Sequence, residues 1–406
     1  MQINKFVFRA LFLTYLLLNV ILGCYYYISG YVGGDLKVGS KTGLILEQPQ
    51  LLIYSIVLVC FTLILLTLWS YFCERIKVVK YELDLDEKFV SLIFTLLILV
   101  FYIIGYFYPA RLVNQGIISY HPLALFFLMF FQVKYLFLFY LVYFIDSKTT
   151  IYKVNFILYL VWAISSGYTF YLLFIFVIYL LRNLKEINLY FAFKLACIAV
   201  VILPVLRLLK YYFLGLASVE SGQDFDFLSL MTDRYDGYID LYLSMLITTM
   251  ERFQHVANVY FSWVNESVLS SRIENGTIGM FYIDGWYQYA ILSKLVSLNF
   301  EMHIQEALAN MIFPYSYWRS QIGIAGWGAI SLWHYFSAIV YGFFAIFLMY
   351  MPMKILNRPN FNIFNYIATI FLVFHAWFND VSTYIQAMYI FVAILFVCSL
   401  VKRVLR

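Results

Sequence analysis

Residues 51–72 form the apolar run LLIYSIVLVCFTLILLTLWSYF, which contains no charged residue. A helix of about 20 apolar residues is long enough to cross the roughly 30 Å hydrocarbon core of a bilayer. Further apolar runs occupy residues 10–28, 89–108, 123–145, 154–181, 190–213, 322–351, 363–378 and 384–401. The sequence therefore predicts an all-α, polytopic membrane helix bundle.

The composition agrees with this prediction over the whole chain. Hydrophobic residues make up 64% of the 406 residues and charged residues only 12%, with a mean hydropathy of +0.84. Soluble domains usually carry about 25% charged residues, so we expect one integral membrane domain, 1–406. The five cysteines have no disulfide or metal-ligand spacing, and no metal or cofactor is expected. Lys and Arg on loops account for the net charge of +5, which gives no indication of nucleic-acid binding.

The distribution of basic residues predicts the orientation. Lys and Arg concentrate in the linkers 73–88, 146–153, 182–188, 353–360 and 401–406, which the positive-inside rule assigns to the cytoplasm. Because both flanks of the run 154–181 are basic, we expect two short crossings there, with a turn at SSG, residues 165–167. The prediction is then about ten or eleven spans. The long segment 214–321 lies outside the cytoplasm, on the same side as the loops 30–50 and 109–122.

The segment 214–321 is rich in aromatic residues, and we expect several helices within it. In TTMERFQHVANVYFSW, residues 248–263, helical spacing aligns Glu251, His255, Asn258 and Ser262 on one face, with Arg252 beside them. Such a polar stripe is costly to bury unless it has a function. The alternative is a solvated face of a surface helix, in which Glu251 and His255 form a weak pair.

Basic residues recur in the same external segment, against the positive-inside bias. Arg234, Arg272, Lys294 and Arg319 belong to this set. Arginine binds phosphate in planar, bidentate fashion, so these residues are candidates for a lipid pyrophosphate site. The alternative is that each arginine pairs with a nearby acid.

Other polar residues carry weaker signals. Lys134 lies in the middle of an apolar run and is expected to face the bundle interior or a cavity. His303, His334 and His375 are more often satisfied interface residues than catalysts. Walker loops and HExxH motifs do not occur, which disfavours ATP-driven transport and zinc proteolysis.

This layout resembles the bacterial oligosaccharide repeat-unit polymerases of the Wzy type, from O-antigen and capsule pathways. The resemblance is carried by the short span pair with SSG at its turn and by a long external segment. That segment contains ERFQHVAN (251–258) and ENGTIGMFYIDGWYQY (274–289), and closes with NMIFPYSYWRSQIGIAGWGAI (310–330). The architecture covers the whole chain, whereas these strings cover under a third of it.

The resemblance implies a metal-independent glycosyltransferase of the bacterial inner membrane with its active site facing the periplasm. The substrate would be an oligosaccharide on undecaprenyl pyrophosphate, and a chain-length regulator and a flippase would be partners. His255 would be the base, with Glu251 orienting it or replacing it. The developing pyrophosphate charge would be stabilised by Arg252, Arg272 and Arg319, with Arg234 as a weaker candidate. Trp286 would stack on a sugar.

Four other functions remain open. A flippase should show a pseudo-repeat and shorter loops, and an O-antigen ligase would share the donor but use a different acceptor. A lipid-phosphate-sugar glycosyltransferase would need an acid in the first external loop, where Asp35 lies. A membrane acyltransferase would need a histidine within the membrane region, for which His375 is the candidate.

Overall fold

The structure is a computed structural model. It describes residues 3–37, 43–108, 118–165, 169–183, 238–251, 253–283, 300–312 and 320–404, with scattered residues between 190 and 212. The chain divides into two compact units. Unit 1 comprises Met1–Arg75, Glu186–Phe347 and Asn365–Val381, and unit 2 comprises Ile76–Lys185, Leu348–Phe364 and Ser382–Arg406.

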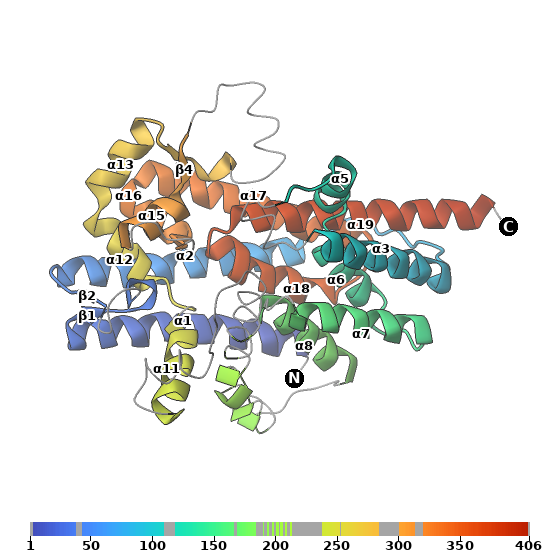
Figure 1. The fold of residues 1–406 in the computed structure, drawn as a ribbon, viewed down its shortest axis with the longest axis horizontal. Coiled ribbons are helices and arrows are strands. Elements are labelled where there is room, and N and C mark those ends of the chain that lie inside the picture. The colour runs from blue at the N-terminus through green and yellow to red at the C-terminus, as the bar shows by residue number, and fades with distance from the viewer. Residues whose placement is uncertain are drawn as a thin grey trace. The chain divides into compact units, whose positions relative to one another are not determined.

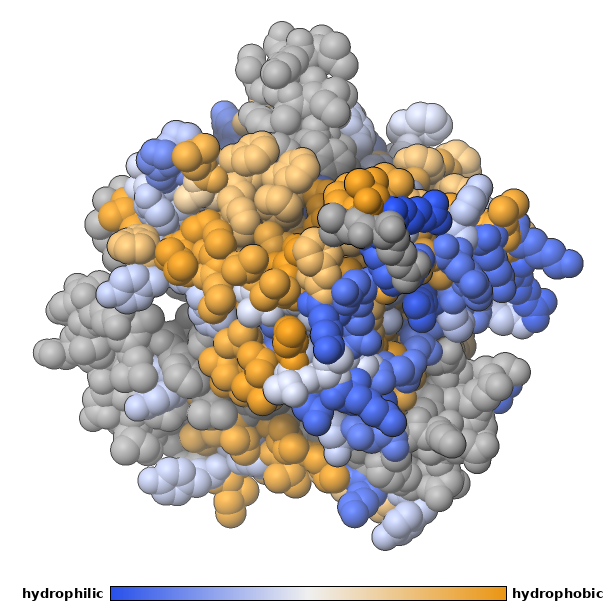
Figure 2. All heavy atoms as spheres, turned by 90° about the vertical axis from the view of Figure 1, so that its right-hand side faces the viewer, coloured by the Kyte–Doolittle hydropathy of each residue, from blue (hydrophilic) through white to orange (hydrophobic). Residues whose placement is uncertain are grey.

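Long apolar helices dominate both units. Among the described residues, six helices are long and apolar enough to cross a membrane: Phe6–Ser29, Pro49–Arg75, Glu87–Phe107, Pro122–Tyr143, Leu332–Ile355 and Phe378–Val404. Their outer faces expose large apolar side chains, such as Leu68, Ile103 and Val397. Hydrophobic side chains also cover much of the face in Figure 2, with hydrophilic ones gathered in one region. The protein is therefore a multi-pass membrane protein, as the composition predicts.

Unit 1 begins with two spans, α1 (Ile3–Ser29) and α2 (Pro49–Arg75), which pack against each other (Figure 1). Between them lie an antiparallel pair, β1 (Tyr31–Val32) and β2 (Leu44–Ile45), and a 3-10 turn, η1 (Gly34–Lys37). The later part of unit 1 contains α11 (Tyr238–Glu251), α12 (Val256–Val264), α13 (Glu266–Glu274), η2 (Phe281–Ile283), α15 (Ile304–Ile312), α16 (Gly323–Ile330) and the π-helix η3 (Thr369–Phe374).

Helix α12 is central to unit 1. It packs against α1, α2, η1 and α16, and its residues from Val256 to Ser262 are all buried. Within 214–321, the described parts are therefore helical, as predicted. They also contain a short parallel pair, β3 (Ile278–Gly279) and β4 (Met302–His303), which hydropathy does not indicate.

The apolar run 322–351 does not form one continuous helix. The chain forms a short buried helix, α16, and then α17 (Leu332–Ile355), because Ser331 between them is extended (φ −163°, ψ 143°). The backbone N–H of Ser331 donates to the Trp327 carbonyl and ends α16. Its hydroxyl accepts from the backbone N–H of Trp333 at 3.2 Å and starts α17. Hydropathy cannot detect this break because every neighbouring residue is apolar.

Unit 2 contains α3 (Glu87–Phe107), α5 (Pro122–Phe131), α6 (Val133–Tyr143), α7 (Thr150–Ser165) and α8 (Thr169–Asn183). It also contains the end of α17, part of α18 (Phe361–Ala368) and most of α19 (Phe378–Val404). Separate helices α7 and α8 on either side of the predicted turn confirm that residues 154–181 do not form one span. Gln132, with φ of 48°, divides the predicted span 123–145 into α5 and α6.

The core of unit 2 is aromatic, with a small polar network inside it. The rings of Phe94 and Tyr140 stack with centroids 4.6 Å apart. The Tyr140 hydroxyl bonds the Ser91 hydroxyl at 2.9 Å, and the Asn155 side-chain amide donates to the Ser91 carbonyl at 3.0 Å. Because hydrogen bonds are strong in an apolar surrounding, this network ties α3, α6 and α7 together. Lys134, predicted to face the interior, is half-buried on α6.

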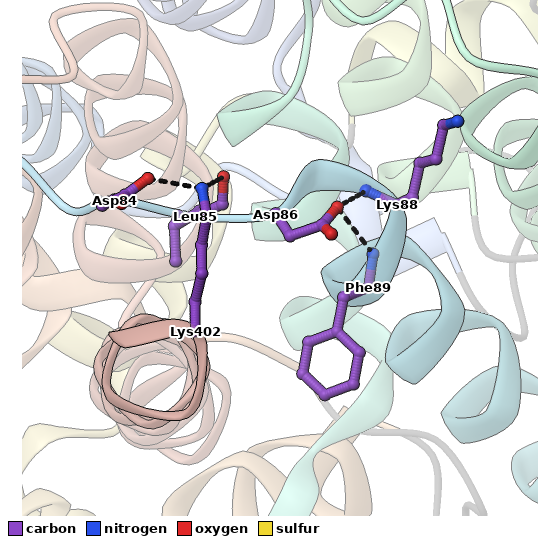
Figure 3. A network of polar contacts seen from close by, with 6 residues as sticks. All are labelled: Asp84, Leu85, Asp86, Lys88, Phe89 and Lys402. Carbon is purple, nitrogen blue, oxygen red and sulfur yellow. Dashed lines mark hydrogen bonds and ion pairs between the residues drawn. The ribbon is translucent and has the colours of Figure 1, made fainter. Parts of the chain in front are cut away.

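Side-chain contacts also hold the linker before α3 (Figure 3). Lys402 on α19 forms an ion pair with Asp84 and donates to the Leu85 carbonyl at 3.0 Å. The carboxylate of Asp86 accepts from the backbone N–H groups of Lys88 at 2.9 Å and Phe89 at 3.3 Å, and so caps α3. An N-terminal cap of this kind is worth about 1 kcal/mol.

Candidate functional site

The stretch that contains Glu251 and His255 lies at a break between two helices. Helix α11 ends at Glu251 and α12 begins at Val256, so the prediction of one continuous helical face is wrong. The break is stabilised by side chains. Asn19 Oδ1 accepts from the backbone N–H of His255 at 2.8 Å, and Gln254 Oε1 accepts from that of Ala257 at 2.9 Å. In a continuous helix, these two N–H groups would donate to backbone carbonyls one turn earlier. At the break, the side chains of Asn19 and Gln254 accept from them instead.

Burial decides between the two interpretations of this stretch. The side chains of Glu251 and His255 are both 2% exposed, and those of Gln254 and Asn258 are also buried. The interpretation as a solvated surface face is therefore wrong. Polar groups inside an apolar unit cost free energy unless they are bonded or serve a function.

A hydrogen-bonded group joins three distant segments of unit 1. Asp35 on η1 accepts through Oδ2 from the Ser320 hydroxyl at 2.8 Å. The side-chain amide of Asn258 donates to the Gln321 carbonyl at 2.7 Å and lies 3.3 Å from both Asp35 Oδ2 and Ser320 Oγ. Asn258 and Ser320 are buried, whereas Asp35 is half-exposed. We name Asp35, Asn258 and Ser320 the carboxylate group.

A second carboxylate lies deeper in the same unit. The Glu251 side chain lies close to the hydroxyl of Tyr26 on α1, and Asp35 also acts on this hydroxyl at longer range. Two carboxylates therefore face one tyrosine from η1 and from the end of α11.

His255 is paired with His375. Their ring centroids lie 4.1 Å apart at an interplanar angle of 75°, and both side chains are buried. Burial lowers the pKa of His255 to about 3, and a charged His375 ring would likewise be costly to bury. Both rings are thus neutral near pH 7, and His255 is a weak proton acceptor there.

The remaining candidates are only partly placed. Arg272 lies in the last turn of α13 and is half-buried, and within the described residues no hydrogen bond or ion pair joins it to the carboxylate group. A cation in the last turn is also favoured by the helix dipole alone. The remaining candidates, Arg234, Arg252, Arg319 and Trp286, lie outside the described residues.

Sequence reasoning undervalued several residues of this site. Asp35 was considered for one alternative function only, and His375 was interpreted as an interface residue. Asn19 was not considered, although a lone amide in an apolar run is a signal, since polar groups inside membrane helices are rare and face protein or a cavity. Ser320 and Gln321 carry no detectable signal.

In the described part of the chain, no group of three or more His, Cys, Asp or Glu residues is arranged to hold a metal ion. Comparisons with family models, curated proteins and solved structures find no significant match.

Proposed function

We propose that the protein is a polymerase that joins undecaprenyl-pyrophosphate-linked oligosaccharide repeat units by glycosyl transfer. The proposal rests on the sequence resemblance to Wzy-type polymerases and on one structural observation. This observation is the carboxylate group, in which Asp35, Asn258 and Ser320 meet in a protein of apolar spans. A lipid-linked donor suits a site built among membrane helices, and a held carboxylate suits the activation of a sugar hydroxyl.

In the proposed step, Asp35 takes the proton of the acceptor hydroxyl. The hydroxyl oxygen attacks the anomeric carbon of the donor glycan, forming the new glycosidic bond. The bond from that carbon to the pyrophosphate oxygen breaks, and undecaprenyl pyrophosphate leaves as an anion. The Asp35 proton returns to solvent. The proposed base is Asp35 rather than His255, because Asp35 is half-exposed and held by Ser320, whereas the side chain of His255 is 2% exposed.

Asp35 has the geometry for this role. Hydrogen bonds from Ser320 and the neighbouring Asn258 amide reach one carboxylate oxygen, Oδ2, and fix the plane of the group. The half-exposed side chain is also more accessible to a substrate than the buried Glu251. Ordering of the base before the reaction lowers the entropic part of the barrier.

The arginines are proposed to stabilise the leaving pyrophosphate. Arg319 directly precedes Ser320 in the chain, and Arg252 directly follows Glu251. Arg272 lies on α13, which packs against α12 and α16. A periplasmic location for this site follows from the positive-inside pattern and belongs to the proposal.

A second candidate is a glycosyltransferase that uses a lipid-phosphate-linked sugar as donor. The contact of Asp35 with Asn258 and Ser320 favours it specifically, because such an enzyme needs an acid in the first external loop. The two candidates share the base and differ in the donor: one transfers an oligosaccharide from pyrophosphate, the other a single sugar from phosphate.

The test is the ladder of lipid-linked glycan in cells that lack their own copy, complemented at matched membrane levels. Wild type should restore the ladder. Asp35→Asn should lower polymerisation by roughly 100-fold or more, the usual contribution of a general base. Asp240→Asn, an exposed acid on α11, is the matched control and should restore the ladder.

The deletion strain separates the alternatives. A single repeat unit left on the lipid supports the polymerase. Absence of any surface-exposed unit supports a flippase, and a normal ladder that stays on its carrier lipid supports a ligase. Repeat units that lack one side-branch sugar support the lipid-phosphate-sugar enzyme. Any of the last three results contradicts the polymerase.

A further inference from the structure

The His255–His375 pair is built from several unusual backbone features. The π-helix η3 ends immediately before His375, and Ala376 after it has φ of 56°, a left-handed conformation that is rare for alanine. On the facing side, Gly323 has φ of 68°, and a Cβ there would lie 3.1 Å from His255 Nδ1. π-turns often occur at functional sites, and a strained residue of this kind costs about 1–3 kcal/mol.

Aromatic rings enclose the pair. The Phe374 ring lies edge-on to His255 with centroids 5.2 Å apart, and the Tyr15 ring lies 5.8 Å from that of His375. Phe371 stacks with His375 at 6.3 Å. These contacts fix the planes of both imidazoles while leaving their nitrogens to other partners.

The nitrogens of the pair have no protein partner among the described residues. Neither Nδ1 nor Nε2 of His255 makes a hydrogen bond there, and the same holds for His375 Nε2 and Trp377 Nε1. Each unmade bond of a buried polar atom costs about 1–3 kcal/mol. Four buried nitrogens without a described hydrogen-bond partner therefore lie in one region, on rings next to strained backbone. We interpret this region as a site where a bound ligand supplies the missing hydrogen bonds.

The chemistry of the rings limits what that ligand can be. A neutral imidazole has one N–H donor and one acceptor nitrogen. Two of them, with the indole N–H of Trp377, match a group that both donates and accepts, as a sugar hydroxyl does. The two neutral rings carry no positive charge of their own with which to select an anion. The pair also lies close to the proposed base, since Asn258 of the carboxylate group follows His255 by three residues on α12.

We propose that His255 and His375 form a neutral imidazole pair that binds a hydroxyl group of the glycan, and that they do not transfer the proton. This inference rests on the proposed function and assigns the glycan part of the substrate to this pair. His375 thereby becomes a specificity-determining residue of unit 1.

The experiment compares two probes on the full chain in lipid nanodiscs. One probe is the lipid-linked repeat unit extracted from the deletion strain, and the other is undecaprenyl pyrophosphate, which has no sugar. Binding of each is measured for wild type, His375→Leu and His375→Gln. Matched unfolding midpoints establish that the variants are folded.

Loss of one or two hydrogen bonds predicts a weakening of roughly tenfold for the repeat unit with His375→Leu. Binding of undecaprenyl pyrophosphate should stay within about twofold, since its affinity does not depend on the lost hydrogen bonds. Glutamine keeps a donor and an acceptor, so His375→Gln should retain most of the binding and of the ladder.

Several results would overturn the inference. Equal weakening of both probes would show that the pair only supports the fold, and unchanged binding with His375→Leu would show a packing contact. Normal binding with a lost ladder in His375→Gln would assign proton transfer to this residue. If wild type does not prefer the repeat unit to the bare lipid, the proposed substrate is wrong, and this inference is wrong with it.

One result would contradict the proposed catalytic base without contradicting this inference. It is an intact ladder with Asp35→Asn while the repeat unit still binds at the pair.

A second measurement needs no substitution. The chain contains five histidines, so ¹⁵N-histidine labelling gives few imidazole resonances. The two signals of the buried pair should shift when the repeat unit is added and stay unchanged with undecaprenyl pyrophosphate. Absence of a shift with the repeat unit at saturating concentration would contradict the inference.

Discussion

Lowering the pH from 7 to 5 should destabilise unit 1 through His255. Burial lowers the pKa of this imidazole to about 3, whereas the ordinary value of an exposed histidine is 6.5. Because the folded pKa lies below the unfolded one, the neutral ring stabilises the fold fully above pH 6.5. As the pH falls below 6.5, the unfolded chain binds a proton that the folded chain excludes, and stability is lost.

The size of this effect follows from the two pKa values. Between pH 7 and pH 5, one group with these values loses about 2 kcal/mol of unfolding free energy. Typical proteins have only about 5–15 kcal/mol of unfolding free energy, so the change is a large fraction of the total.

The assay is unfolding of the purified protein in mixed micelles by titration with sodium dodecyl sulfate at each pH, followed by circular dichroism. Other acidic groups of the chain contribute to the pH dependence as well, so the decisive quantity is a difference between proteins. The double variant His255→Gln, His375→Gln keeps polar side chains of similar reach but cannot titrate. It should lose at least about 2 kcal/mol less than wild type over the same pH interval. Equal losses in the two proteins would refute the assignment of two buried neutral rings.

Two further predictions concern local backbone and capping. Gly323→Ala should lower the unfolding free energy by about 1–3 kcal/mol, because alanine is strained at φ of 68° and its Cβ would crowd His255. The matched control is Gly105→Ala in α3, which has open space and should change stability by no more than about 1 kcal/mol, in the stabilising direction. Asp86→Ala should cost about 1 kcal/mol by removing the cap of α3, whereas Lys402→Met, which removes the partly exposed ion pair and the bond to the Leu85 carbonyl, should cost less. Titrations with sodium dodecyl sulfate measure all four, and a larger loss from Lys402→Met than from Asp86→Ala would contradict this order.

Among the described residues, hydropathy predicts the six long apolar helices, because the length and apolar character of a span are properties of one continuous stretch of sequence. A helix in lipid satisfies its own backbone hydrogen bonds, so about 20 apolar residues are sufficient evidence for a span. The breaks at Gln132 and Ser331 and the break between α11 and α12 were not predictable in this way. The first depends on the left-handed backbone of Gln132 and the second on the extended backbone of Ser331. The third depends on the hydrogen bond from the His255 N–H to the Asn19 side chain.

The site was harder to predict than the spans because its contacts are distant in sequence. The bond from His255 to Asn19 spans 236 residues, and that from Ser320 to Asp35 spans 285. Helical spacing groups His255 with its neighbours and singles out a stretch that is buried in the structure. It could not indicate that the partners of this stretch come from α1, η1 and the segment before α16.

The carboxylate group also constrains the topology independently of charge. Asp35 lies between α1 and α2, and it contacts Asn258 and Ser320 in the segment 214–321, so we expect both regions on the same side of the membrane. The chain between residues 35 and 258 must then cross an even number of times. With one crossing for each of the predicted spans 51–72, 89–108, 123–145 and 190–213, residues 154–181 contribute none or two. A single span there would separate Asp35 from Asn258, whereas the helical pair α7 and α8 allows their contact. The contact therefore disfavours a single crossing at 154–181 and is compatible with the two short crossings that the positive-inside pattern predicts there.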